Sequence, residues 1–185
     1  CIRDRNHSVR RVNLATGVVT TIAGSPGQPG FADGVANSAL FSGPSGLAVE
    51  FEPLALQLTR ERTGEPPRPV SVVIADTGNR AIRRVWEDGR VETLKTLTPH
   101  PPETESLSLQ QSEPDAPVPF AIALDPRGDI YVSSPATGEV LVLLAGGGVS
   151  RAAQPGTFQN PVSLGFSSAS NLLVIEDTAK QIHYG

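Results

Sequence analysis

The sequence predicts an all-β protein built from repeated units of about four short strands. The chain of 185 residues contains 18 glycines and 17 prolines, which is high for a helical protein. Its Val, Ile and Leu residues stand in short runs between turn residues, as strands of a repeat fold do. No segment keeps the 3.6-residue apolar period over the length of a long amphipathic helix.

One hairpin phrase recurs along the chain, in residues 2–12, 74–85, 131–141 and 175–182. Each copy has an apolar strand end, an acidic or hydroxyl residue, a tight turn and a second apolar strand. We expect each Asp to accept hydrogen bonds from backbone N–H groups of its own turn. We expect Gly78 or Asn79 to adopt the left-handed conformation there. The predicted structural turn residues are Asp4, Asn6, Asp76, Gly78, Asn79 and Asp177.

Two further strands flank each hairpin. Upstream lie the runs 46–49, 120–124 and 162–166, and downstream lie 18–23, 91–94 and 149–152. Four short strands per unit is the composition of a β-propeller blade. The chain begins in the second strand of a unit and ends in the third strand of another, so residues 1–185 predict about three to four blades in an incomplete ring. A closed four-bladed ring of about 46 residues per blade is the alternative.

The residue pattern of these units resembles the NHL repeat family. It includes Asp-x-x-Asn-Arg-x-Ile-Arg-Arg-Val from Asp76, and the runs 16–24, 30–34 and 43–49. The similarity is strong over 2–49 and 70–94 and weaker from Pro119 onward. It implies an NHL-type β-propeller. Because NHL propellers typically have six blades, the resemblance also implies that the missing blades belong to a longer polypeptide.

Two insertions, residues 50–69 and 95–118, interrupt the repeat. The second is rich in Pro, Ser and Glu and has no aromatic residue, so it cannot bury enough apolar surface to order itself. The first contains apolar side chains that need cover, which makes it either a partner-docking surface or a shield for its own blade. These candidate interaction residues are Phe51, Leu54, Leu56 and Leu58.

Arginine pairs stand at equivalent positions of two units, at 10–11 and 83–84. Strand alternation sends one member of each pair between blades and the other outside. Arg10 and Arg83 are therefore candidates either for an anionic or RNA ligand or for salt bridges between blades. The formal net charge of −4 argues against nucleic acid as the partner.

No spacing of residues predicts a catalytic or metal site. The three histidines, His7, His100 and His183, do not share a repeat position, and the single cysteine excludes an internal disulfide. No apolar run approaches the roughly 20 residues needed to cross a bilayer. We therefore expect no cofactor and no catalytic residue.

These observations together predict a non-catalytic protein-interaction scaffold, with protein partners that include the rest of its own longer chain. The resemblance implies two alternatives. One is a metal-dependent propeller enzyme, of the amidating-lyase or hydrolase type, that holds its ion on the axis with His and Asp from several blades. The other is an RNA-binding NHL domain.

Overall fold

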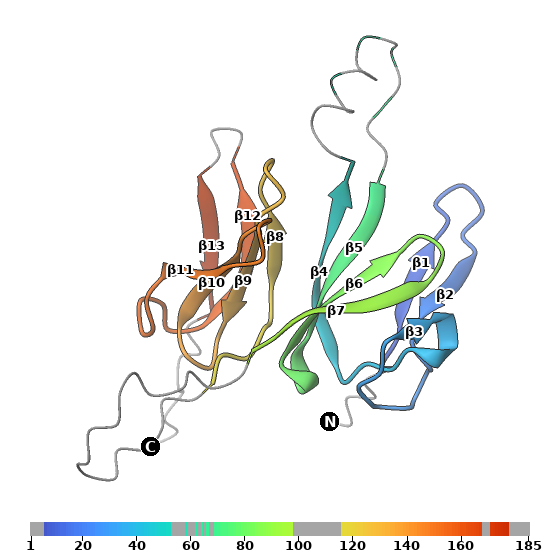
Figure 1. Ribbon diagram of the computed structural model, residues 1–185, viewed down its shortest axis with the longest axis horizontal. Coiled ribbons are helices and arrows are strands. Elements are labelled where there is room, and N and C mark those ends of the chain that lie inside the picture. Colours follow the sequence, from blue (N-terminus) through green and yellow to red (C-terminus); the bar gives the residue numbers. More distant parts are fainter. Residues whose placement is uncertain are drawn as a thin grey trace, which may run out of the picture.

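The computed structural model in Figure 1 describes residues 6–52, 58, 62, 64, 66, 69–97, 116–167 and 171–177. Its regular structure is almost entirely β-strand. The described helices include two single 3-10 turns, η1 (Ala36–Ser38) and η2 (Thr77–Asn79). Among the described residues there is no helix of the length and apolarity that a membrane crossing requires.

The described strands form four antiparallel sheets, numbered here along the chain. Sheet 1 contains β1 (Val9–Val12) and β2 (Val19–Ala23), and sheet 4 contains β12 (Pro161–Phe166) and β13 (Leu172–Glu176). Sheet 2 contains β3 (Gly34–Val35), β4 (Pro44–Phe51), β5 (Pro69–Asp76), β6 (Ala81–Trp86) and β7 (Arg90–Thr96). Sheet 3 contains β8 (Ile122–Leu124), β9 (Ile130–Ser134), β10 (Glu139–Leu143) and β11 (Val149–Ala153).

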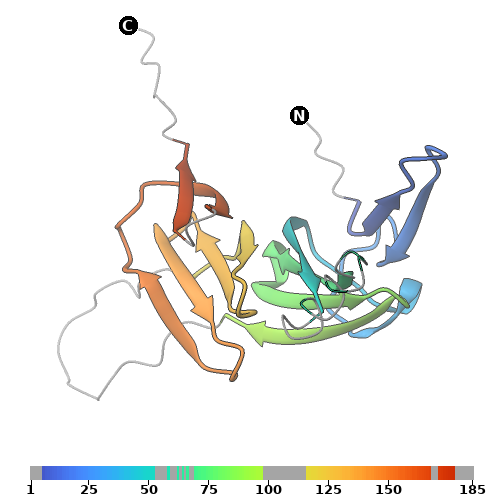
Figure 2. The same cartoon turned by 90° about the horizontal axis from the view of Figure 1, so that it is seen from above.

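The sheets lie side by side in an open arc, which Figure 2 shows from above. In sheets 2 and 3 the four successive strands pair in chain order, as the repeat predicts. The first strands of neighbouring sheets, β4, β8 and β12, lie next to one another. Sheet 2 has a fifth strand that the repeat did not predict, because β3, in the linker from sheet 1, pairs with the outer edge of β7.

The strands reach further into the two insertions than their composition suggested. The alternating burial of β4 continues through Glu50 to Phe51, which pairs with Pro69 at the start of β5. β7 likewise continues to Thr96. The connections between strands are therefore residues 52–68 and 97–121. Leu54, Leu56 and residues 98–115 lie outside the described residues.

The central strands of sheet 2, β5 and β6, are buried on both faces because successive side chains point to opposite faces. On one face Ile74 and Val85 pack with Val9 of sheet 1 and with Phe41 of the linker. On the other face β5 and β6 pack against sheet 3, in a cluster of Val73, Ala75, Ile82, Ile122, Ile130, Val132 and Leu143. Such face-to-face burial of successive sheets is what stabilises a repeat fold of this kind.

Sheets 2 and 3 come closest at Gly46 of β4. A Cβ on Gly46 would collide with the carbonyl oxygen of Phe120 and lie 2.9 Å from the Cα of Ala121. This position therefore requires glycine for the approach of one backbone to another.

Candidate functional site

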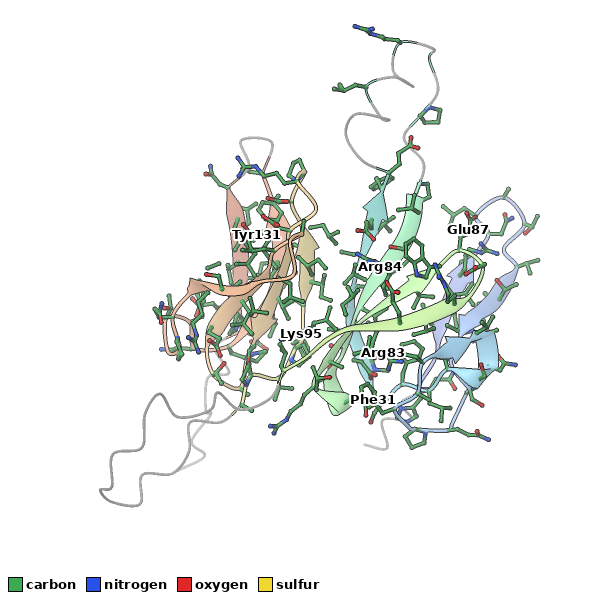
Figure 3. The ribbon with its side chains drawn as sticks, viewed as in Figure 1. Phe31, Arg83, Arg84, Glu87, Lys95 and Tyr131 are labelled. Carbon is green, nitrogen blue, oxygen red and sulfur yellow. The ribbon has the colours of Figure 1, made fainter. Side chains whose placement is uncertain are left out.

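Arg83 is the centre of the strongest polar cluster in the described residues. Its side chain is fully buried, and its two terminal nitrogens contact Asp76 Oδ2 at 2.9 Å and Asp33 Oδ1 at 2.8 Å. The same nitrogens donate to the carbonyl oxygens of Ala32, at 2.8 Å, and Leu40, at 3.2 Å. Arg83 therefore joins β6 to the linker between sheets 1 and 2 (Figure 3).

Aromatic rings complete the surroundings of Arg83. The guanidinium carbon lies 5.0 Å from the ring centroids of both Phe31 and Phe41. Phe41 is fully buried, whereas Phe31 is about half exposed. Cation–π contact and ion pairing together hold the guanidinium in the interior. Arg83 forms its ion pairs within sheet 2 and with the linker that enters that sheet, and not with a neighbouring sheet, and its buried side chain is not open to an external anion.

Asp76 bonds to the backbone of the linker and not to the backbone of its own turn, contrary to the expectation from the repeat. Its Oδ1 accepts from the backbone N–H of Ser42 at 2.7 Å, and its Oδ2 accepts from Asn79 Nδ2 at 2.7 Å. Asp76 makes no side-chain hydrogen bond to the backbone of the following turn. The turn is closed instead by the backbone N–H of Arg80, which donates to the Thr77 carbonyl at 3.1 Å.

The left-handed residue of this turn is Arg80, with φ of 49°, and not Gly78 or Asn79. His7 and Gly138 occupy the same place in their units and also have positive φ. Gly78 is required for another reason, since a Cβ there would collide with the Ser42 carbonyl and hydroxyl. The Asn79 amide donates to the Gly30 carbonyl at 2.7 Å and so also ties the turn to the linker.

The two carboxylates around Arg83 have opposite pKa shifts. Burial raises the pKa of Asp76, and the hydrogen bonds from Asn79, Ser42 and Arg83 oppose this without overcoming it. Burial also acts to raise the pKa of Asp33, but the hydrogen bonds from Thr93 and the charge of Arg83 outweigh it and lower that pKa. Asp33 is half exposed, which accounts for its smaller desolvation.

Arg84 points to the opposite face of sheet 2, as strand alternation requires. It pairs with Glu50 at 2.9 Å and with Glu92 at 3.1 Å, joining β6 to β4 and β7. The Trp86 ring contacts the guanidinium groups of Arg84 and Arg90, whose carbons are 5.4 and 4.8 Å from its centroid. Both arginines of this pair are therefore engaged within the fold.

Sheet 3 builds the same geometry without the aspartate and the arginine. Ser134 takes the place of Asp76, and its hydroxyl accepts from the backbone N–H of Val118 at 3.0 Å. Thr137 replaces Asn79 and bonds to Ser134 at 2.8 Å. Leu141 stands where sheet 2 has Arg83 and is buried. The ion pair of this sheet is instead between Glu139 and Arg151, at 2.9 Å.

In sheet 4 the residue equivalent to Asp76 is Glu176, and not Asp177. Pro161 pairs with Glu176 as Pro44 pairs with Asp76, and each pairing is followed by a register shift. Glu176 Oε1 accepts from the backbone N–H of Gln159 at 2.7 Å, which repeats the bond from Ser42 to Asp76. The hairpin phrase had aligned Asp177 one residue too far along the chain.

The candidate interaction residues fall into three groups. Phe51 and Leu58 are 48% and 51% exposed, whereas Leu54 and Leu56 lie outside the described residues. Arg10 is exposed and makes no ion pair with a described residue, unlike the equivalent Arg83. Of the first turn, Asn6 is exposed and Asp4 is not among the described residues.

One side of β4 is an exposed apolar surface. The sequence predicted only the last of its residues, Phe51, as an interaction residue. Leu47, Val49 and Phe51 are 59%, 42% and 48% exposed. We call them the β4 row. Leu47 and Val49 pair with Ile74 and Val72, which pack toward sheet 1. The β4 row therefore lies on that face of sheet 2, and its exposure shows that β1 and β2 do not cover it. The alternation of residues 47 to 51 could have revealed the row, but which face lacks cover depends on the neighbouring sheet.

An open hollow lies against the β1–β2 hairpin, lined by Arg11, Asn13, Thr16, Val18 and Thr20. Within the part of the chain that the structure describes, no three His, Cys, Asp or Glu side chains are grouped to hold a metal ion.

Solved structures resemble this chain in fold. A streptogramin B lyase has a TM-score of 0.58 and 14% identity, covering 94% of this chain and 42% of the lyase. Virginiamycin B lyase from Staphylococcus aureus has a TM-score of 0.55 and 12% identity, covering 94% and 43%. An auxiliary nutrient binding protein from Bacteroides ovatus has a TM-score of 0.44 and 22% identity, covering 72% and 31%.

No family model and no curated protein matches the sequence. At these identities the likeness to the two lyases concerns the fold alone, and it supports an all-β, propeller-like architecture. The chain spans less than half of the length of either lyase.

Proposed function

We propose that this chain is a non-catalytic scaffold of NHL-type propeller blades that binds a protein partner through the β4 row and the connection that follows it. The proposal rests chiefly on the exposure of the β4 row, in which three apolar side chains are 59%, 42% and 48% exposed. Adjacent exposed apolar side chains of this kind mark interaction surfaces. Leu58, 51% exposed, adds a fourth apolar side chain in residues 52–68.

The position of the polar groups supports the same proposal. Arg83 is buried and Arg84 is engaged by two glutamates, so neither guanidinium is free to capture an anion. The largest charged clusters thus stabilise the scaffold, and the apolar surface is left for recognition. The net charge of −4 adds no attraction for nucleic acid.

The NHL type is part of this proposal. It is supported by the repeated phrases in sheets 1 and 2 and by the four-strand pairing of sheets 2 and 3. The most divergent units, sheets 3 and 4, keep the hydrogen bond from linker to second strand although their side chains differ. A longer protein of this family would supply further blades.

Site-specific photo-crosslinking tests the binding surface. A benzoylphenylalanine at position 51 should crosslink to a protein partner, whereas the same probe at exposed Ser150 on β11 should not. Leu47→Ser combined with Val49→Ser should abolish the crosslink from position 51 without unfolding the chain, since both side chains are exposed. Equal crosslinking from positions 51 and 150, or none from either, would remove the proposal.

A metal-dependent enzyme is the second candidate, because two of the similar folds are lyases. Metal analysis of the full-length protein distinguishes the two functions. Stoichiometric zinc or calcium bound between the inner strands of several sheets would favour the enzyme. Salt-dependent binding of single-stranded RNA would instead favour an RNA-binding domain.

A further inference from the structure

Two aspartates of this chain are followed by glycine, Asp33 in the linker before β3 and Asp88 in the turn between β6 and β7. Such an aspartate can react with its own backbone, because glycine has no side chain to hinder its nitrogen from reaching the preceding carboxyl carbon. A C–N bond forms, the amide proton and the carboxyl hydroxyl leave as water, and a five-membered succinimide results. Water then opens the ring at the main-chain carbonyl and leaves isoaspartate, in which the backbone runs through Cβ.

Asp33 is restrained against this reaction. Its Oδ1 accepts from Arg83 Nη2 at 2.8 Å and from Thr93 Oγ1 at 2.9 Å, and its Oδ2 accepts from the Thr93 N–H at 3.0 Å. The attacking nitrogen would be that of Gly34, which β3 fixes by pairing with Val91 of β7. The lowered pKa of Asp33 adds to this protection, because the ionised carboxylate lacks the hydroxyl group that has to leave.

Asp88 has fewer restraints. Its side chain is exposed, and within the described residues its carboxylate accepts one hydrogen bond, from the Arg90 N–H at 2.9 Å. Glu87 and Arg90, on either side of the Asp–Gly pair, are exposed as well. The Gly89 N–H donates to the Trp86 carbonyl at 3.0 Å, so the turn has to open locally before the reaction. Opening an exposed turn costs less free energy than breaking the bonds of Asp33 to a buried arginine.

We propose that Asp88 is a site of spontaneous isomerisation to isoaspartate in the folded protein, and that Asp33 is protected from it. Both sites have the same dipeptide and a side chain that reaches solvent, so the difference in reactivity comes from their hydrogen bonds. The reaction loses one water and regains one, and it involves no oxidation or reduction. The proposal is independent of the proposed function, because both sites lie outside the β4 row.

Isomerisation at Asp88 changes a contact between two sheets. Gly89 is buried, and a Cβ on it would lie 2.9 Å from the Ile22 carbonyl oxygen of sheet 1. Its carbonyl accepts from the N–H of Ala36, in η1 of the linker, at 2.9 Å. Isoaspartate adds one methylene to the backbone directly before Gly89, and this displaces the turn from β2 and η1. Modification of one exposed aspartate therefore weakens the packing of sheet 2 on sheet 1.

Peptide mapping of the full chain tests the proposal. The folded protein is aged in mildly acidic buffer at physiological temperature, and isoaspartate is located by electron-transfer fragmentation of tryptic peptides. Trypsin places the two sites on separate peptides, residues 85–90 and 12–60, and each peptide contains a single aspartate. Isoaspartate should accumulate at Asp88 at least about ten times faster than at Asp33, because further hydrogen bonds have to break before Asp33 can react.

Two controls show whether the folded structure sets this ratio. In denaturing urea, where both dipeptides are released from their contacts, the two rates should become similar. Asp88→Glu should abolish the signal in peptide 85–90, because glutamate would have to form a larger ring, and should leave the slow reaction at Asp33 unchanged. A ratio that persists in urea would overturn the proposal, since the neighbouring sequence and not the fold would then determine it.

Equal or faster isomerisation at Asp33 in the folded protein would also overturn it, as would isoaspartate that forms in urea but at neither site of the folded chain. Hydrogen exchange tests the consequence for the contact. The Ala36 N–H should exchange faster in the isomerised protein than in an equally aged Asp88→Glu sample. Unchanged exchange would contradict the weakening of the contact between sheets 1 and 2.

Discussion

Sheets 2 and 3 are equivalent in backbone but not in chemistry. At the end of its second strand sheet 2 has Asp76 and sheet 3 has Ser134, and each accepts a backbone N–H from the linker that enters its own sheet. On the third strand sheet 2 has buried Arg83, whereas sheet 3 has buried Leu141. The acid and the arginine are absent together from sheet 3.

This difference distinguishes a feature that these sheets share from one that only sheet 2 has. An acceptor at the end of the second strand is common to sheets 2, 3 and 4, where aspartate, serine and glutamate each provide it. The arginine is an addition that joins sheet 2 to the linker of residues 24–43. Sheet 3 places its own ion pair, Glu139 with Arg151, on two strands of the same sheet.

The largest loss of stability should come from replacing the arginine of sheet 2 with the leucine of sheet 3 while the aspartate remains. Arg83→Leu leaves Asp76 buried without its cation and should reduce the free energy of unfolding by about 3–5 kcal/mol. Arg84→Leu is the control, because Arg84 is partly exposed, and it should cost about 1 kcal/mol or less. Urea unfolding measures both, and equal losses would mean that burial of the pair is unimportant.

The contact between sheets 2 and 3 provides the next largest effect. Gly46→Ala would force β4 away from the backbone at Phe120 and should cost about 1–3 kcal/mol. Gly165→Ala on β12 is the matched control, since nothing lies within 4 Å of its added Cβ. Thermal unfolding should show a lower Tm for the first variant only. A normal Tm for Gly46→Ala would contradict the close approach.

Between sheets 3 and 4 an aromatic pair should have a smaller effect. The rings of Tyr131 and Phe166 meet edge to face, with centroids 5.0 Å apart and planes at 79°. Phe166→Leu keeps an apolar side chain but removes this geometry, and should cost about 0.5–1.5 kcal/mol. A double-mutant cycle with Tyr131→Leu isolates the pair, and a coupling energy of zero would show that the rings do not interact.

The smallest effect should be the change with pH in the contribution of Asp33 to the free energy of unfolding. Its pKa is lowered from the usual 3.8 in the folded state, so its contribution to stability is present above that pH and is lost as pH falls through the folded pKa. The difference in stability between the unmodified chain and Asp33→Asn should therefore shrink below pH 3.8. Because Asp33 is half exposed, this difference in stability should stay below about 1 kcal/mol. A stability difference that grows on acidification would contradict the lowered pKa of Asp33.

Hairpins and strand order could be predicted from the sequence because turn residues and apolar alternation are local signals. Sheets 2 and 3 pair in the expected order, and the two arginines of 83–84 point to opposite faces of β6. The role of Asp76 could not be predicted in this way, because its partner Ser42 is 34 residues distant and belongs to the linker.

Other features depended on long-range packing in the same way. The fifth strand β3 forms only because the linker folds back on β7, and its two residues have no strand pattern of their own. The place of Glu176 follows from its pairing with Pro161, and the neighbouring Asp177 was the natural choice when only the hairpin phrase was compared. Leu47 and Val49 of the β4 row were not predicted, because the exposure of a strand face depends on the neighbouring sheet.

We conclude that the cluster of Asp76 and Arg83 stabilises sheet 2 and is replaceable by the serine and leucine that stand at the same positions in sheet 3. A double-mutant cycle of Asp76→Ser and Arg83→Leu, measured by urea unfolding, tests it most directly. The double variant should lose several kcal/mol less than the sum of the single variants, and should keep the crosslink from position 51. Additive losses, or a double variant that folds normally but no longer crosslinks, would contradict the claim.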